Sequence, residues 1–158
     1  MPKKRIIIEI PEKNSSAVAS LLADKAPATC RAIWDLLAKP LEILGTHAMW
    51  TGPEISMQVA PERAGETLDK IPPENLTVFP QAGSLVWAHL PPHAFAGRPE
   101  PLYDIGLFYG PQGRIFLPMG WVPCNHFAQI EGDWPEFQTA CRSLLTEGRR
   151  RLILRREE

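Results

Sequence analysis

The feature that most constrains the fold is the alternation of residues at the start of the chain. Ile6, Ile8 and Ile10 fall on one face of an extended segment over residues 5–10, which predicts a strand with a fully apolar face. A polar turn over residues 11–16 and a second extended run over residues 17–22 follow. Together the two runs predict an antiparallel hairpin.

A helix is expected next, over about residues 26–38. Pro27 suits the first helical turn, where its missing N–H costs nothing. Cys30, Ile33, Trp34 and Leu37 then follow the spacing of a single buried helical stripe. The proline at position 40 ends this helix.

Short strands dominate the rest of the chain, with one more helix. Strands are expected over residues 41–47, 54–59, 76–79, 84–90, 102–109, 114–117 and 152–154. Residues 60–75 are polar and proline-rich, which favours a surface loop. A second helix is expected over residues 134–147, with Asp133 and Glu136 as a capping box and Gly148 at its end.

These elements predict a mainly β fold made of one domain over residues 1–158. About eight short strands with two amphipathic helices favour a closed antiparallel eight-stranded β-barrel whose open ends the helices cap.

Charge and composition exclude several classes of partner. The net charge is −1, so neither nucleic acid nor a membrane surface is expected as a partner. No apolar run approaches the roughly 20 residues of a spanning helix. Three cysteines without a close pair favour a reduced, cytoplasmic protein. The sequence predicts no cofactor.

Several motifs resemble those of cyclophilins. Leu22–Cys30 is similar to the passage from strand to first helix in that family, and Phe127–Asp133 to the strand and turn before the second helix. His47–Ile55, Gly83–Pro92 and Leu107–Gly110 look more like uncharacterised bacterial cyclophilin-like proteins, although Ser84 departs from the expected aspartate. The resemblance implies an eight-stranded barrel with two capping helices, and it raises peptidyl-prolyl isomerase activity as a candidate.

The residues that the resemblance would assign to isomerisation are largely missing. In cyclophilins an arginine directly after a strand histidine donates to the proline nitrogen, whereas Ala48 follows His47 here. The family's glutamine-glycine-glycine stretch is also absent. Trp121 and His126 do keep the separation of a tryptophan–histidine pair in the cyclophilin pocket. A residual isomerase is therefore kept as an alternative function only.

The middle of the chain holds the candidate site residues. The first hypothesis is a binding module with a central, aromatic-lined pocket for a small molecule, lined by His47, Trp50, Glu54, Trp87, His89, Tyr103 and Trp121. Core packing is the competing interpretation for the aromatic residues.

The same region of the chain also offers candidates for catalysis and for metal binding. A small-substrate enzyme would use His47 or His126 as base with Glu54 as acid, if a hairpin makes them face one cavity. The competing interpretation is that His47 ends a strand and Glu54 is solvated. No metal is expected, because the prolines between His89 and His93 forbid a regular helix. Aromatic residues beside loops also predict a homo-oligomer.

Overall fold

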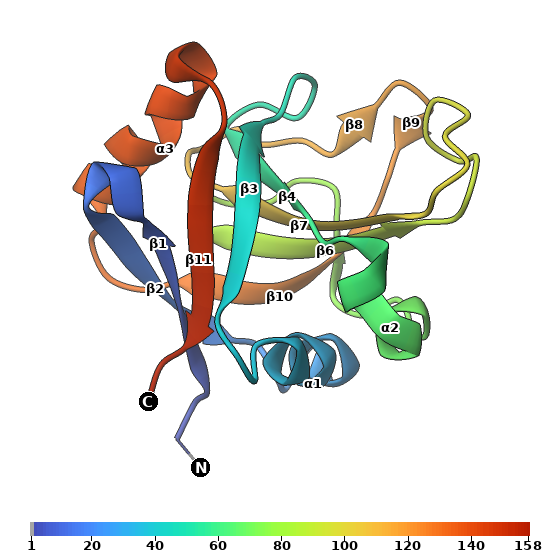
Figure 1. Ribbon diagram of the computed structural model, residues 1–158, viewed down its shortest axis with the longest axis horizontal. Helices are drawn as coiled ribbons and strands as arrows, with labels where there is room; N and C mark the ends of the chain where they lie inside the picture. Colours follow the sequence, from blue (N-terminus) through green and yellow to red (C-terminus); the bar gives the residue numbers. More distant parts are fainter. Residues whose placement is uncertain (1) are drawn as a thin grey trace.

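The barrel is a closed ring of eight antiparallel strands in a computed structural model that describes residues 2–158 (Figure 1). The ring runs in the order β2, β1, β11, β3, β4, β7, β6 and β10, and β10 pairs with β2 to close it. Its members are β1 (Arg5–Ile10), β2 (Ser15–Leu21), β3 (Leu41–His47), β4 (Glu54–Gln58), β6 (Ser84–Leu90), β7 (Leu102–Phe108), β10 (Cys124–Ile130) and β11 (Arg150–Arg156). The predicted fold class is confirmed.

Two of the expected strands lie outside this ring. The run expected over residues 76–79 forms only β5 (Leu76–Thr77), which pairs with the first residues of β10. The run expected over residues 114–117 shortens to β8 (Phe116–Leu117), which pairs with β9 (Gly120–Trp121) as a separate two-stranded sheet. Apolar character did not distinguish them from wall strands, although Leu76 and Phe116 are exposed in the structure.

The two predicted helices are present, and a third was not predicted. The predicted pair corresponds to α1 (Pro27–Leu36) and α3 (Pro135–Glu147), whereas α2 (Pro61–Asp69) replaces part of the expected surface loop. Ala64 and Leu68 are its buried residues, and Gly65 interrupts it with a φ of 59°. Two apolar positions in a polar segment are too weak a period to predict a helix. No helix in residues 2–158 has the length and apolar character needed to cross a membrane.

The helix ends differ from the predicted capping. Trp134, not Asp133, is the N-cap of α3, and no side chain makes a capping hydrogen bond there, so the capping box was wrong. Gly148 ends α3 with a φ of 89°, as its predicted role requires. The N-terminus of α1 is capped from a distance, since Glu74 accepts hydrogen bonds from the backbone N–H groups of Ala28 at 3.0 Å and Thr29 at 2.9 Å.

The barrel wall is buried on both faces where residues 111–123, which we call the arm, cross it. Inward-facing residues such as Ile55 and Ile105 join the main core. On the outer face a second, smaller core forms under the arm from Val86, Phe108, Ile115 and Cys124. Burial on two faces explains why β6 and β7 carry apolar residues on both faces rather than strict alternation.

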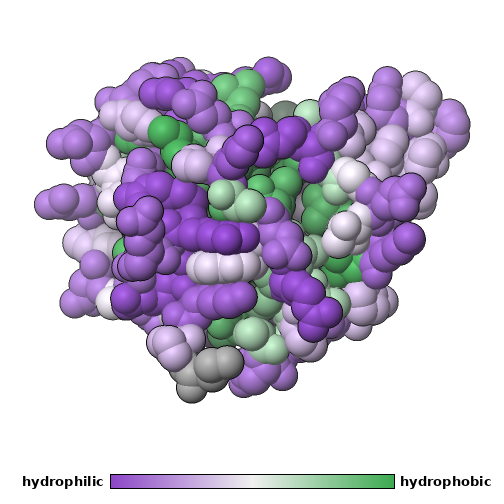
Figure 2. Space-filling view, turned by 60° about the horizontal axis from the view of Figure 1, so that its bottom comes forward, coloured by the Kyte–Doolittle hydropathy of each residue, from purple (hydrophilic) through white to green (hydrophobic). Residues whose placement is uncertain are grey.

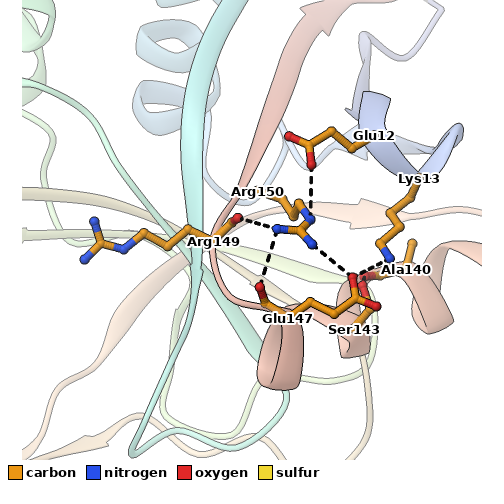
Figure 3. A network of polar contacts seen from close by, with 7 residues as sticks. All are labelled: Glu12, Lys13, Ala140, Ser143, Glu147, Arg149 and Arg150. Atoms are coloured by element: carbon orange, nitrogen blue, oxygen red, sulfur yellow. Dashed lines mark hydrogen bonds and ion pairs between the residues drawn. The ribbon is translucent and has the colours of Figure 1, made fainter.

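A polar network joins three elements at the other end of the barrel (Figure 3). Arg150, the first residue of β11, contacts Glu12 at 3.2 Å and Glu147 at 3.1 Å. Lys13, in the short helix η1 (Pro11–Lys13), pairs with the same Glu147 at the end of α3. The network therefore holds α3 against the β1–β2 turn and β11.

Candidate functional site

An open cleft lies where the ends of β6 and β10 meet the segment that connects α2 to β5. Its volume is about 350 Å³. Figure 2 brings the α1–α2 end of the molecule forward and shows a mostly hydrophilic face on which apolar residues gather in hollows. The residues that line the cleft are Ile71, Pro72, Pro73, Leu76, Trp87, Ala88, His89, Val122, Pro123 and Asn125.

The imidazole of His89 is held in one orientation at the wall of the cleft. It stacks on Tyr103, with ring centroids 4.9 Å apart and planes within 6°. Its Nε2 lies 3.6 Å from a carboxylate oxygen of Asp69, at the end of α2. The Tyr103 hydroxyl donates to the same carboxylate, and this hydrogen bond, with burial and the charge of Asp69, raises the pKa of Tyr103 to about 12. Trp87 also stacks against Tyr103, and their ring centroids are 6.2 Å apart.

Asn125 fixes the opposite wall. Its amide donates to the Thr29 hydroxyl at 2.9 Å and to the carbonyl of Pro72 at 2.8 Å, and its oxygen accepts from the N–H of Glu74 at 3.1 Å. The side chain is therefore fully engaged in holding the loop before β5. This leaves His89 as the polar group of the cleft best placed to meet a ligand.

A second cavity, which we call the chamber, lies on the outer face of the barrel beneath the arm. It has a volume of about 50 Å³ and shares Ala88 and Val122 with the cleft. Two carboxyl groups, those of Glu54 and Asp104, line it. Its other lining residues are Thr51, Val86, Ala88, Leu90, Leu102, Ile115, Leu117, Val122 and Cys124.

The chamber favours protonated carboxyl groups. Burial raises the pKa of Glu54 and the charge of Asp104 raises it further, while the nearby Thr51 hydroxyl opposes the rise. Burial also raises the pKa of Asp104, although hydrogen bonds from Ser56 and the backbone of Met57 oppose it. The Ser56 hydroxyl donates to Asp104 at 2.6 Å. Burial, followed by the two carboxyl charges, raises the pKa of Cys124 to about 12, so its thiol stays neutral.

His47 and Glu54 do not face one cavity, so the arrangement that a small-substrate enzyme would require is absent. His47 pairs with Ile55, which points into the barrel core, whereas Glu54 is the preceding residue of β4 and faces the chamber. The Nε2 of His47 instead lies 2.7 Å from the hydroxyl of Tyr109. An acid–base pair between His47 and Glu54 is therefore not formed.

The remaining sequence candidates are dispersed. Trp50 is exposed and packs edge-on against Phe95 with centroids 5.9 Å apart. Trp121 is 52% exposed on the arm, next to Phe79 and Phe116. The Nε2 of His126 lies 3.1 Å from the carbonyl oxygen of Ala128, and burial lowers its pKa.

The seven residues predicted to bind a ligand therefore divide among several places. Trp87 and His89 line the cleft, Tyr103 supports His89, and Glu54 lines the chamber. Sequence reasoning missed Asp69, Asp104 and Asn125. Of these, only Asp104 carried a signal, as a charged residue inside an otherwise apolar strand.

The fold and these two cavities define a closed antiparallel barrel with a cleft at one end and an acidic chamber on its outer wall. The model of a family described as "Protein of unknown function (DUF3830)" matches residues 8–155. The chain belongs to this family.

Solved structures show the same fold. One similar structure is that of McbB in complex with tryptophan, with a TM-score of 0.68 and 16% identity. The match covers 95% of this chain but 44% of McbB, so the chain spans less than half of that protein. Another is the solution structure of the hypothetical protein AF2241 from Archaeoglobus fulgidus, with a TM-score of 0.57, 18% identity, and coverage of 98% of this chain and 95% of that one. No curated protein matches the sequence.

Proposed function

We propose that this protein binds a small, partly apolar molecule in the cleft, with the His89 imidazole as its main polar contact. The observation that carries the proposal is the fixed orientation of His89, which stacks on Tyr103 and faces Asp69 at the wall of the cleft. Binding sites hold their polar groups in place through surrounding contacts of this kind.

The shape and lining of the cleft support the same proposal. A volume of about 350 Å³ falls in the range of small-molecule sites. Prolines, Leu76 and Trp87 supply apolar walls around the single imidazole. McbB was solved with tryptophan, so tryptophan and indole are sensible first probes beside a metabolite library.

A thermal-shift screen tests the proposal directly. A ligand at 100 times its Kd would add roughly 2.7 kcal/mol to the free energy of unfolding, which corresponds to a Tm increase of several degrees. Leu76→Asp, on an exposed residue of the cleft, should abolish the shift without unfolding the protein. Leu145→Asp is the matched control, because Leu145 is exposed on α3 outside the cleft.

Two results would reject the cleft as the binding site. One is the absence of any stabilising ligand in a broad library. The other is a ligand whose shift survives both Leu76→Asp and His89→Ala.

A cyclophilin-like relationship remains part of the proposal. Its support is the ring of eight antiparallel strands in which α1 follows β2 and α3 follows β10. Residual proline isomerisation and catalysis by His47 or His126 stay predictions. A protease-free cis–trans assay on X–Pro peptides tests the first, and loss of any turnover in His47→Ala or His126→Ala tests the second.

A cytoplasmic location also remains a proposal. Its support is the state of Cys30, Cys124 and Cys141, which are all buried thiols rather than disulfides.

A further inference from the structure

We propose that the chamber beneath the arm binds the ammonium group of a small primary amine, held between the carboxyl groups of Glu54 and Asp104. This site is distinct from the cleft, and its argument does not depend on what the cleft binds. It rests on the placement of the two acids, an unused hydroxyl beside them, and the charge and size of the cavity.

The two carboxyl groups converge because of strand register. Glu54 on β4 and Asp104 on β7 lie on the outer face, on either side of the pair formed by Ser56 and Gly106. The Asp104 side chain points toward this pair, and its carboxylate accepts a hydrogen bond from the Ser56 hydroxyl. The Glu54 side chain lies against Gly106, because a Cβ added to Gly106 would lie only 2.8 Å from the Oε1 of Glu54. The glycine thus leaves the space that the Glu54 carboxyl occupies.

Thr51 supplies an independent indication that a polar ligand belongs in the chamber. The residue is only 3% exposed and lines the cavity. Its hydroxyl lies near Glu54, yet it is the buried side-chain polar atom in residues 2–158 without a partner at hydrogen-bond distance and angle. Buried hydroxyl groups are costly to leave unpaired, so a bound group that pairs with Thr51 would recover this loss.

The charge of the chamber favours a cation. None of its lining residues, all of them within residues 2–158, is a lysine or an arginine. A buried carboxyl group, Glu54, beside a partly buried one, Asp104, without a countercharge must keep protons or acquire a positive ligand. A primary ammonium group brings one positive charge and three N–H donors. Those donors match Glu54, Asp104 and the Thr51 hydroxyl.

The size and apolar lining select an amine over a metal ion. The volume of about 50 Å³ is one to two times the ~30 Å³ that a water molecule occupies in the liquid, which suits an ammonium head and a short carbon chain. Ca²⁺ and Mg²⁺ take about six oxygen ligands, more than this set of side chains offers. Val86, Ile115 and Val122 form an apolar wall that suits an alkyl chain.

Three leucines that line the chamber, Leu90, Leu102 and Leu117, are only partly buried, as are Ala88 and Val122. A ligand would therefore enter between the arm and the ends of β6 and β7, with its carbon chain toward these leucines and its ammonium group toward Glu54.

Calorimetric titration with methylammonium, ethylammonium and propylammonium chloride tests the proposal. Binding is expected for at least one amine, with proton release that appears as a dependence of the measured heat on the ionisation enthalpy of the buffer. Tetramethylammonium, which has no N–H donor, should bind at least about tenfold more weakly. Glu54→Gln and Asp104→Asn should each weaken binding about tenfold or more.

Matched controls separate a lost site from a lost fold. Glu42→Gln changes an exposed glutamate on β3 and should leave amine affinity unchanged. Leu76→Asp, which disrupts the cleft, should also leave it unchanged, so failure of the cleft proposal and failure of this one are distinguishable. Thermal melts show that each variant is folded before titration.

Three outcomes would overturn the assignment. The first is no heat with any of the three amines and the folded wild-type protein. The second is equal affinity for tetramethylammonium. The third is amine binding that persists unchanged in folded Glu54→Gln and Asp104→Asn.

Discussion

The most unusual residue of the molecule is Glu54, a glutamate with 6% of its surface exposed in the wall of a barrel. Its neighbour in the chamber is another carboxyl group, so the environment penalises the charged form of both. An apolar residue at position 54 would avoid the free-energy cost of burying a carboxyl group. Such placements are more typical of binding or catalytic sites than of structural positions.

Glu54 should make the stability of the protein fall as the pH rises. Its pKa in the folded state is raised from 4.5 to about 8, so the folded protein holds its proton where the unfolded chain releases it. Stability is therefore highest below about pH 4.5 for this group and decreases toward pH 8. Glu54→Gln should remove this slope and raise the free energy of unfolding at pH 8 by roughly 1–3 kcal/mol.

Denaturant melts of the wild type and Glu54→Gln at pH 5 and pH 8 measure this effect. Glu42→Gln serves as the control and should keep the slope of the wild type. If Glu54→Gln lowers stability equally at both pH values, the carboxyl group is not protonated in the folded protein.

At this scale the sequence singled out Glu54 as a site residue but predicted neither the chamber nor Asp104. Glu54 stood out beside the turn of residues 50–53, but its partner Asp104 lies 50 positions along the chain. Their meeting depends on the register of β4 against β7, which no local pattern reveals. His47 and Glu54 illustrate the same limit, since a difference of one residue in register decides which face a side chain takes.

Helix α1 depends on a glutamate far away in the chain. Burial alone would raise the pKa of Glu74, but hydrogen bonds from Thr29 and Ala28 outweigh burial and lower it. The Thr29 hydroxyl also donates to Glu74 at 2.8 Å. Because the N-cap residue Ala26 has no capping side chain, Glu74 takes over its role.

Glu74→Ala should destabilise the protein by about 1 kcal/mol, the usual value of a lost helix cap. The lowered pKa means that the contribution of Glu74 is present above the ordinary carboxyl pKa of 4.5 and is lost as the pH falls below it. Urea melts should show a larger difference between wild type and variant at pH 7 than at pH 3. Glu136→Ala on α3, where no side-chain cap exists, is the control and should change stability by less than about 0.5 kcal/mol.

The contact between β3 and β11 is also sensitive to one atom. A Cβ on Gly45 would lie 2.4 Å from Cδ1 of Leu152 and 2.9 Å from Cγ2 of Ile55. Gly45→Ala should therefore destabilise the barrel by roughly 1–3 kcal/mol through overpacking. Thermal unfolding would check this, with Thr46→Ala on the exposed face of the same strand as control. Equal melting temperatures for the two variants would contradict the packing argument.

At the level of elements, the residue pattern predicted seven of the eight wall strands and both of the longer helices. The eighth strand, β10, was indicated only from Phe127 onward, and only by the resemblance to cyclophilins. Alternating and helical patterns of apolar residues predict an element well where it has one buried face, as in β1 and α1. They fail for α2, which buries only two residues, and for β5 and β8, whose apolar residues Leu76 and Phe116 are exposed.

The whole molecule carries a group of exposed apolar residues around the arm. Phe79, Phe116, Met119 and Trp121 are each between 46% and 65% exposed. Clusters of this kind are typical of contacts between proteins. The homo-oligomer expected from the sequence remains a prediction, and this surface is where we expect its contact.

Light scattering after size-exclusion chromatography measures the oligomeric state. The wild type should elute as an oligomer, and Trp121→Glu should shift it to the monomer while its circular dichroism spectrum is retained. Leu145→Glu, an exposed apolar residue on α3, is the control. A monomeric wild type, or an oligomer unaffected by Trp121→Glu, would show the prediction to be wrong.

The pairing of β11 with β1 on one side and β3 on the other bears on how the chain is made (Figure 1). During synthesis β1 and β3 leave the ribosome long before residues 150–156, the strand that joins them. Until that strand appears, both keep an unpaired edge and the apolar interior stays accessible. Barrel closure therefore waits for the synthesis of β11, and a chain interrupted before Arg150 should be recognised by chaperones or degraded.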